Sequence, residues 1–489
     1  MTTQTTPRAL VPQLLALACP HTNEDHEHQL TRDGVQALAN WYEHPQPAAS
    51  EPAARPNLDR MIAELDNLLS RQMDAILHHP DFQALEASWR GLKSLVERTD
   101  FGENIRLRVL NVTTQELSED FDEAAEISQS CYYRHVYASG FGQYGGEPVA
   151  AVIGDFAFTQ QAPDIRLLHQ LATVGAMAHA PFISSVSARF FGLQHFGELG
   201  QIQDLNALLA GNGYLRWHGL RTTEDARYLG LTCPRFLLRL PYDPLDNPTH
   251  SFCYQEQTQA NHQHYLWGNS AYLLASTLTR SFARYRWCPN IIGPRHGGEI
   301  NGLPIPLFES MGQWQSRIPT EVLITDRREL ELAEAGFIPL TQRKDSGSAA
   351  FFSANSVQKP QVYAQTESGQ QQALNYRLAT QLPYLMIICR LAHYLKVLQR
   401  EQIGAWKERQ DLQRELNRWI RQYIADQENP PADVRSRRPL RAAAVEVLET
   451  PGEAGWYQVR LMVRPHFKYM GASFELSLVG RLDREPVAS

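Results

Sequence analysis

Residues 148–186, PVAAVIGDFAFTQQAPDIRLLHQLATVGAMAHAPFISSV, decide the fold class. Two short segments rich in β-branched residues, PVAAVIG (148–154) and PFISSV (181–186), are typical of buried strands. Between them, LLHQLATVGAMAH (167–179) has the apolar spacing of a helix. This alternation predicts an α/β fold, in which a mostly parallel or mixed sheet lies between helices.

The same alternation continues in both directions along the chain. Upstream, Asn57 is a candidate N-cap for a strongly periodic apolar helix. Downstream, HYLWGNSAYLLASTLTRSFARY (264–285) is also predicted to be helical. Further strand-like runs, again short and apolar, are IRLRVLNV (105–112), RFLLRL (235–240) and EVLIT (321–325).

The last third of the chain has a different pattern. A long helix is predicted from Tyr376 to Ile403, and ENPPADVRSRRP (428–439) is predicted to be a loop because of its prolines. Three strands should follow, among them YQVRLMVR (457–464) and SFELSLV (473–479), which alternate apolar and polar residues. A second helix carries a narrow apolar seam formed by Leu412, Leu416, Trp419 and Tyr423.

These patterns predict a multi-domain α/β (α+β) chain, since 489 residues exceed what one hydrophobic core usually holds. Residues 1–56 form an N-terminal segment that ends in a Pro/Ala-rich linker. Residues 57–370 form the α/β body, a mixed sheet flanked by helices. Residues 371–489 form a C-terminal helix-and-strand domain.

Composition excludes several classes of protein. The chain has 46 Lys plus Arg against 53 Asp plus Glu, and a net charge of −7 gives no general reason to bind nucleic acid or an anionic membrane. Its six cysteines are scattered without a C-x-x-C pair, which is typical of a reducing compartment. We see no signal peptide and no apolar run of about 18 residues, so we expect a cytoplasmic protein without direct membrane insertion.

Gly140, Gly142 and Gly145 satisfy the G-x-G-x-x-G pattern of dinucleotide sites. Such a site needs a helix N-terminus directly after the glycines, to hold the pyrophosphate. Here the glycines lead into the strand-like EPVAAVIG, so we interpret them as a flexible turn between strands. Because no Walker A pattern occurs either, we expect no nucleotide cofactor.

Two His-x-His pairs are candidate metal ligands, namely His26 with His28 and His262 with His264. Such a pair suits zinc only if a third ligand converges on it, and no HExxH motif or cysteine pair lies nearby. We therefore expect hydrogen-bonded or solvated histidines, with no catalytic residues and no bound metal. The alternative is a metal- or nucleotide-dependent enzyme centred on Gly140–Gly146 or on His262 and His264.

Three further groups of residues are candidates for binding other proteins. The basic cluster Arg435, Arg437, Arg438 and Arg441 lacks interleaved aromatic residues for nucleic acid, so it either fixes its loop by ion pairs or contacts a protein partner. Val11, Leu14, Leu15 and Ala18 share one face of a short helix, which either docks on the chain's own body or fills a groove of another protein. The last strand carries Phe474, Leu476 and Leu478 on one face, and its simplest role is a hairpin with residues 457–464.

From about residue 57 to 483 the chain resembles the large sheath subunit of type VI secretion systems, the TssC/VipB family. The resemblance runs through many long blocks in the same order, including GEPVAAVIGDFAF (146–158), DARYLGLTCPRFLLRLPY (225–242), FFSANSVQKP (351–360) and VRPHFKYMGASFELSLVGRLD (463–483).

This resemblance implies a non-enzymatic subunit with a contractile tail-sheath-like fold. It implies a heterodimer with a small sheath subunit of the TssB/VipA type, which polymerises as hexameric rings into a helical tube around an inner tube, above a baseplate. Contraction would propel the tube and its effectors out of the cell, with the sheath anchored through the baseplate to an inner-membrane complex. The alternative within this class is an adaptor that scaffolds a secretion complex without polymerising.

The resemblance also assigns roles to two of the three candidate groups. An AAA+ unfoldase would disassemble the contracted sheath by gripping the N-terminal helix of Val11, Leu14, Leu15 and Ala18. The C-terminal domain resembles phage tail sheaths and would lie innermost. The four arginines, whose protein contact is expected from their chemistry and not from the resemblance, are candidates for a tube or subunit contact. The last strand, with Phe474, Leu476 and Leu478, would join a sheet shared between neighbouring subunits.

Overall fold

The computed structural model describes residues 55–466, apart from 245, 251, 259–260, 311–312, 317, 345, 362–375, 377–378, 406–407, 426, 428–429 and 450–456. The chain divides into two units, Met1–Arg71 and Gln72–Ser489. Helix α3 (Arg55–Leu77) contributes to both and confirms the periodic helix predicted from Asn57. Of the first unit, the structure describes only the part of α3 up to Arg71.

A six-stranded mixed sheet lies at the centre of the second unit, in the order β1-β2-β3-β9-β10-β6. The first four strands in this order are parallel, and β10 is antiparallel to both of its neighbours. The strands are β1 (Val152–Phe158), β2 (Phe182–Val186), β3 (Leu229–Cys233), β9 (Ile338–Gln342), β10 (Ala349–Phe351) and β6 (Glu299–Ile300). The predicted α/β class with a mixed sheet is therefore confirmed.

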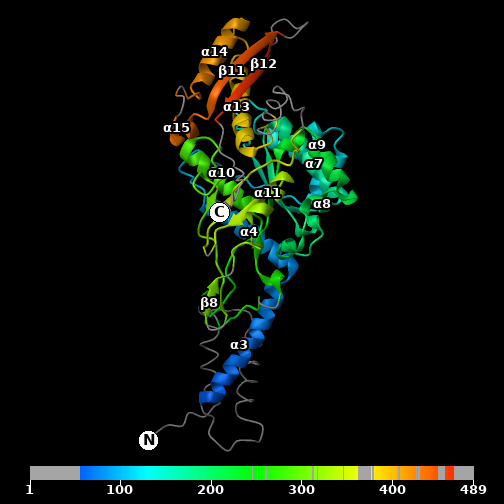
Figure 1. The fold of residues 1–489 in the computed structure, drawn as a ribbon, viewed down its shortest axis with the longest axis vertical. Coiled ribbons are helices and arrows are strands. Elements are labelled where there is room, and N and C mark those ends of the chain that lie inside the picture. The colour runs from blue at the N-terminus through cyan, green and yellow to red at the C-terminus, as the bar shows by residue number, and fades with distance from the viewer. Residues whose placement is uncertain are drawn as a thin grey trace, which may run out of the picture. The chain divides into compact units, whose positions relative to one another are not determined.

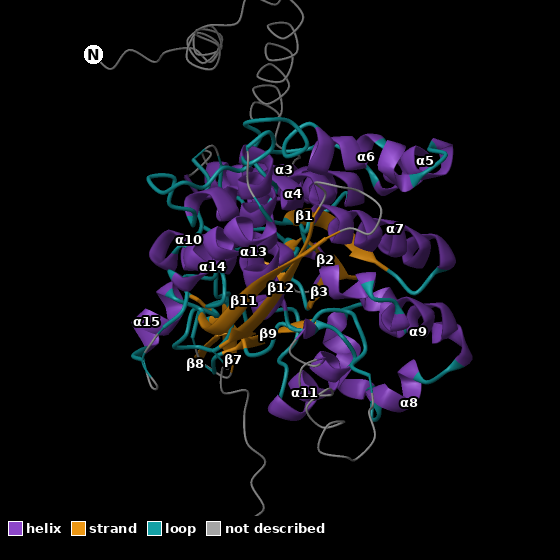
Figure 2. Ribbon diagram, turned by 90° about the horizontal axis from the view of Figure 1, so that it is seen from above, coloured by secondary structure: helices purple, strands orange, loops and turns teal. Residues whose placement is uncertain are grey.

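Helices cover both faces of this sheet, as Figure 2 shows. On one face, α7 (Ala162–Ala178) and α9 (Leu215–Thr222) pack in a first core with Phe182 and Leu231. On the other face, α10 (Ala271–Tyr285) and α13 (Leu382–Glu401) pack in a second core. Strands β2 and β3 are buried along their whole length, because a parallel sheet between helices has no solvated face.

Three two-stranded sheets and seven further α-helices complete the described part of the second unit. The two-stranded sheets are β4 (Phe236–Leu237) with β5 (Trp267–Gly268), β7 (Leu307–Ser310) with β8 (Gln313–Ser316), and β11 (Leu440–Glu449) with β12 (Tyr457–Pro465). The remaining α-helices are α4 (Pro80–Glu97), α5 (Thr114–Glu123), α6 (Cys131–Tyr133), α8 (Leu205–Leu209), α11 (Asp326–Glu334), α14 (Arg409–Arg421) and α15 (Ala432–Arg437). Among the described residues, no helix has both the length and the apolar character needed to cross a membrane.

A third core joins α13 to the C-terminal elements, as Figure 1 shows for α13, α14, β11 and β12. Leu385 and Cys389 of α13 face the second core, whereas Ile387, Leu391 and Leu395 face the third. Helix α13 is thus buried on two sides, and it connects the central sheet with the C-terminal domain.

Four local predictions are wrong. Residues 105–112 form no strand within the described chain, and Val109 and Leu110 are exposed there. Of the runs 235–240 and 321–325, only Phe236–Leu237 is a strand. These runs have strand composition, but the fold gives most of their length no partner strand.

The fourth error concerns the proline-rich segment 428–439, which contains helix α15 rather than only a loop. Pro430 and Pro431 directly precede the helix, and Arg435 N–H donates to the Pro431 carbonyl. Proline is compatible with the start of a helix, because the first amides have no intrahelical acceptor.

The close approach of α4 and α10 yields a test of the fold. A Cβ added to the buried Gly91 would lie 2.5 Å from the Tyr272 ring, whereas one added to Gly219 in α9 meets nothing within 4 Å. We expect Gly91→Ala to lower the free energy of unfolding by about 1–3 kcal/mol, because the added methyl group overpacks this contact. The control Gly219→Ala should stabilise by roughly 0.5–1 kcal/mol, because glycine lowers helix stability. Urea unfolding of both variants measures this difference, and equal effects would contradict the packing described here.

Candidate functional site

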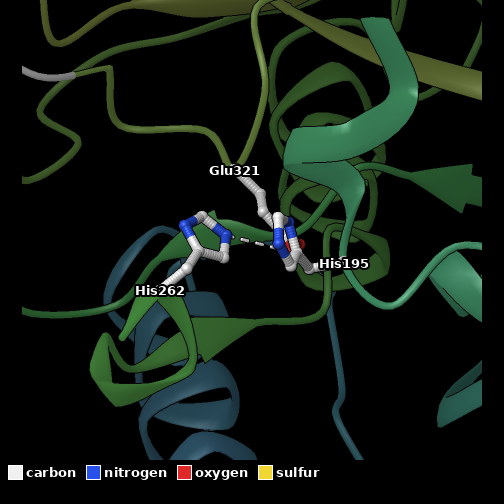
Figure 3. Close-up of side chains that lie close together, drawn as sticks. All are labelled: His195, His262 and Glu321. Atoms are coloured by element: carbon white, nitrogen blue, oxygen red, sulfur yellow. Dashed lines mark hydrogen bonds and ion pairs between the residues drawn. The ribbon is translucent and has the colours of Figure 1, made fainter. Parts of the chain in front are cut away.

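Three side chains with metal-ligating or acid–base chemistry converge in the second unit: His195, His262 and Glu321 (Figure 3). His195 directly precedes the 3-10 helix η4 (Phe196–Gln201), and His262 begins the 3-10 helix η7 (His262–His264). Glu321 lies in the segment that leads to α11. One donor atom of each side chain lies within 4.8 Å of the other two.

Glu321 is buried and makes the most contacts in this cluster. Arg235 donates from Nε to Oε2 at 2.7 Å and from Nη2 to Oε1 at 2.8 Å. The Phe196 amide donates to Oε1 at 3.0 Å, and His262 Nε2 lies 3.3 Å from the same oxygen. Burial alone would raise the pKa of Glu321, but the hydrogen bonds and charges of Arg235 and His262 lower the pKa to about 2. The carboxylate is therefore ionised at neutral pH.

The two histidines lie against each other beside this carboxylate. Their ring centroids are 4.8 Å apart, and His262 also stacks on Trp267 at 4.9 Å. His195 Nε2 is 3.9 Å from Glu198 Oε1, whereas its buried Nδ1 has no hydrogen-bond partner among the described residues. The cluster thus combines one satisfied carboxylate with one unsatisfied imidazole nitrogen.

The predicted pair of His262 and His264 does not act as a unit. His264 stacks on His78 with ring centroids 4.0 Å apart, and its Nδ1 lies 2.9 Å from the Gln257 carbonyl oxygen. A hydrogen-bonded His264 agrees with the sequence-based expectation. The residues that do join His262 could not be found from the sequence, because neither His195 nor Glu321 lies in a motif with it.

A second buried ionic network links α4 to the segment after β4. Arg239 donates to Glu86 Oε1 at 2.9 Å and to Glu256 Oε2 at 2.6 Å, and His78 Nε2 lies 3.3 Å from Glu256 Oε1. Burial alone would lower the pKa of Arg239, but the two carboxylates raise it above its ordinary value. This network fixes the position of α4 relative to the segment after β4.

The glycines of the G-x-G-x-x-G pattern follow a π-helix (Arg134–Ala138) and precede β1. The predicted strand after the glycines begins only at Val152, so residues 147–151 of the predicted segment are not strand, and the strand expected before the turn is wrong. Arg400 of α13 donates to the carbonyl oxygens of Phe141 and Gln143 at 2.9 and 2.7 Å. These contacts hold the loop against α13, and no helix N-terminus follows it that could hold a pyrophosphate.

All four candidate arginines have exposed side chains: Arg435 and Arg437 lie on α15, Arg438 directly follows it, and Arg441 lies at the start of β11. Arg435 Nε donates to the Pro430 carbonyl at 2.7 Å, and Arg437 pairs with Asp433 at 3.2 Å. Among the described residues, Arg438 and Arg441 form no ion pair that would hold them. Two of the four therefore fix the local structure, and the other two remain candidates for an external contact.

The sheet of β11 and β12 has one covered edge and one open edge. The Asn417 amide on α14 bonds the backbone of Val445 in β11, donating to its oxygen at 2.6 Å and accepting from its nitrogen at 3.0 Å. Val445 pairs with Leu461 of β12. Val445 directs its backbone N–H and C=O away from β12, so its partner Leu461 must direct its own N–H and C=O away from β11. Within the described residues, no strand pairs with this outer edge of β12.

The other two predicted binding segments lie outside the described residues. These are the N-terminal helix, with Val11, Leu14, Leu15 and Ala18, and the last strand, with Phe474, Leu476 and Leu478. Both remain predictions.

Comparison with known proteins gives matches over most of the chain. Residues 59–358 match the family model of the EvpB/VC_A0108 tail sheath N-terminal domain, and residues 371–482 match that of the EvpB/VC_A0108 tail sheath gpW/gp25-like domain. The type VI secretion system sheath protein TssC1 of Pseudomonas aeruginosa is 41% identical over 431 residues, which cover 87% of this chain and 86% of that protein.

Two solved structures of the anti-feeding prophage also align with this chain, each at 10% identity. A chain of its baseplate aligns over 64% of this chain and 66% of its own length, with a TM-score of 0.33. A chain of its contracted helical sheath aligns over 65% and 67%, with a TM-score of 0.31.

Glu321 provides a test of the ionic cluster. Because its pKa in the folded state lies below the ordinary 4.5, its stabilising contribution should be present above about pH 4.5 and be lost as the pH falls towards 2. Glu321→Gln should lower the free energy of unfolding at pH 7 by about 3 kcal/mol, because it leaves the Arg235 guanidinium without its charged partner. This variant should also lose less stability than the unmodified chain as the pH falls from 4.5 towards 2.

The matched control is Glu446→Gln, which removes an exposed pair with Arg460 at 3.8 Å. This change should alter stability by less than about 1 kcal/mol. Urea unfolding at several pH values measures both variants. If Glu321→Gln lost as much stability as the unmodified chain at acidic pH, the assignment of Glu321 as an ionised, paired carboxylate would be contradicted.

Proposed function

Because this chain belongs to the EvpB/VC_A0108 family of tail sheath proteins, the large sheath subunits of type VI secretion systems, we propose that it polymerises into a contractile sheath around an inner tube. The extent of the family match, over both domains, carries this proposal. The chain is a structural sheath subunit, and the alternative of a metal- or nucleotide-dependent enzyme is wrong. Contraction would propel the inner tube and its effectors out of the cell.

The building block of this sheath is a heterodimer with a small sheath subunit of the TssB/VipA type. Supporting this, α4 exposes Phe82, Leu85 and Trp89, which recur at helical spacing on one side of the helix. Exposed apolar patches of this kind mark protein interfaces. The heterodimers would stack as hexameric rings into a helical polymer in the cytoplasm, joined to a baseplate and anchored through it to an inner-membrane complex.

The open edge of β12 is the proposed link between subunits. Tyr457, Val459, Leu461 and Val463 pack their side chains on the third core, and their backbone groups face the open edge. A strand added there would gain several hydrogen bonds, each worth about 1 kcal/mol net. The last predicted strand, with Phe474, Leu476 and Leu478, is a candidate for the same shared sheet.

Two properties of the chain suit a contractile polymer. Contacts that join different surfaces of identical subunits do not close, so they generate helical filaments. Contraction then requires two discrete arrangements of these contacts and no chemical step. Arg438 and Arg441 are the proposed tube- or subunit-contact residues, because among the four arginines they form no ion pair within the described chain.

Electron microscopy of the chain co-expressed with its small partner tests this proposal, and we expect long tubes. Leu461→Pro removes an N–H that faces the open edge but no hydrogen bond of the hairpin, so it should spare the heterodimer and abolish the tubes. Leu461→Ala loses similar packing but keeps the donor, and it should still form tubes. Discrete particles from the unmodified pair would instead indicate a non-polymerising adaptor, and tubes of normal length from Leu461→Pro would exclude the shared edge.

We also propose that the N-terminal helix binds an AAA+ unfoldase, which recycles contracted sheath. The supporting observation is the apolar face of Val11, Leu14, Leu15 and Ala18 at helical spacing. Replacing Leu14 and Leu15 by Asp should abolish binding of a peptide of residues 1–22 to the unfoldase, measured by fluorescence anisotropy. Replacing the polar Thr5 and Thr6 should leave binding unchanged, and equal binding of all three peptides would place the contact elsewhere.

A further inference from the structure

We propose that His195, His262 and Glu321 form a binding site for one divalent transition-metal ion, most suitably Zn²⁺ (Figure 3). Two imidazoles and one carboxylate are a common ligand set for zinc, with further positions open to water. This site is independent of the proposed function, since no step of sheath assembly depends on it.

The distances require only a small movement to enclose an ion. Ligand atoms bound to one Zn²⁺ at about 2.0–2.2 Å lie roughly 3–3.5 Å apart in a tetrahedral site. His262 Nε2 and Glu321 Oε1 are already at this separation, 3.3 Å. All three ligand atoms lie within 4.8 Å of one another, so the His195 ring must approach by up to about 1.5 Å. A rotation of this partly exposed ring can supply that movement, because it is not packed on all sides.

The surroundings of His195 suit a ligand. A histidine that binds a metal through one nitrogen usually donates its other N–H to a carboxylate or carbonyl. His195 has this arrangement in outline, because its Nδ1 is buried without a partner and its Nε2 faces Glu198 at 3.9 Å. A metal ion at Nδ1 would satisfy the nitrogen that no described residue satisfies.

Arg235 limits the strength of this site. An ionised carboxylate offers about four acceptor positions, and Arg235 and the Phe196 amide use three of those on Glu321. Two of these three contacts are made to Oε1, so an ion that replaces His262 at Oε1 must compete with Arg235 Nη2 and the Phe196 amide, whereas Oε2 accepts only from Arg235 Nε among the described residues. Because the guanidinium also repels a cation, we expect weaker binding than in a site with three unpaired ligands.

The experiment uses the full chain, freed of metal with a chelator and then titrated with ZnCl₂ in a calorimeter. We expect one saturable site per chain and, with Co²⁺, the visible absorption of tetrahedral coordination. His195→Gln and His262→Gln should each weaken Zn²⁺ binding by more than about tenfold. His169→Gln is the matched control, because His169 is an exposed histidine on α7, and it should bind like the unmodified chain.

Several results would overturn the proposal. An unmodified chain with no saturable Zn²⁺ site would show that the cluster is only a hydrogen-bonded ion pair. Equal binding by the His195 and His262 variants, with loss in a His26→Gln/His28→Gln variant, would place the ion at the N-terminal pair. Circular dichroism of each variant separates loss of a ligand from loss of the fold. A measured site without tubes would contradict the sheath proposal alone, and tubes without a site would contradict the metal proposal alone.

Discussion

The burial of α13 on two sides is the constraint on which the rest of the structure depends. One side of α13 carries Leu382, Leu385 and Cys389, which pack in the core against the central sheet. Residues on the other side, Ile387 and Leu391, form the core of the C-terminal domain with Trp287 and Leu440. A helix with apolar residues on two sides is stable in water only when both sides are packed inside the protein. The central sheet and the C-terminal elements α14, β11 and β12 therefore pack against the same helix.

The sequence contains enough information to predict the long elements but not the short ones. The apolar periodicity of α7 and the β-branched composition of β1 and β2 are strong local signals, and they predict the α/β class correctly. Strands of two or three residues, such as β6 (Glu299–Ile300) and β10 (Ala349–Phe351), carry too few side chains for a period. The opposite error occurs at residues 105–112, because strand composition describes a side chain's fit to a pleated surface and not the presence of a partner strand.

The candidate site was beyond prediction for a different reason. His262 stood out through its spacing from His264, but its actual neighbour Glu321 is 59 residues away and comes from an irregular segment. Glu321 could be recognised only once β4 and the segment that follows Thr320 were known to meet, since Phe236 and Thr320 form a β-bridge beside it. When two irregular segments far apart in the sequence pair, neither carries a periodic residue pattern that would predict the contact. Family resemblance does not help either, because it identifies the assembly and not this cluster.

The two edges of the β11–β12 sheet differ in whether a further strand can pair with them. On the β11 side, the Asn417 side chain forms hydrogen bonds with the backbone N–H and C=O of Val445. The backbone C=O and N–H of Leu440 are likewise bonded to the Ala425 N–H and the Tyr423 C=O. A strand from another subunit could not pair there without displacing α14 from the third core. The β12 edge has no such cover within the described chain, and the side chains beneath it are held by the same core. The closed β11 edge leaves β12 as the edge of this sheet to which a further strand can be added. A strand donated to it from a different part of a neighbouring subunit would make a head-to-tail contact, which is the contact geometry that an open helical polymer requires.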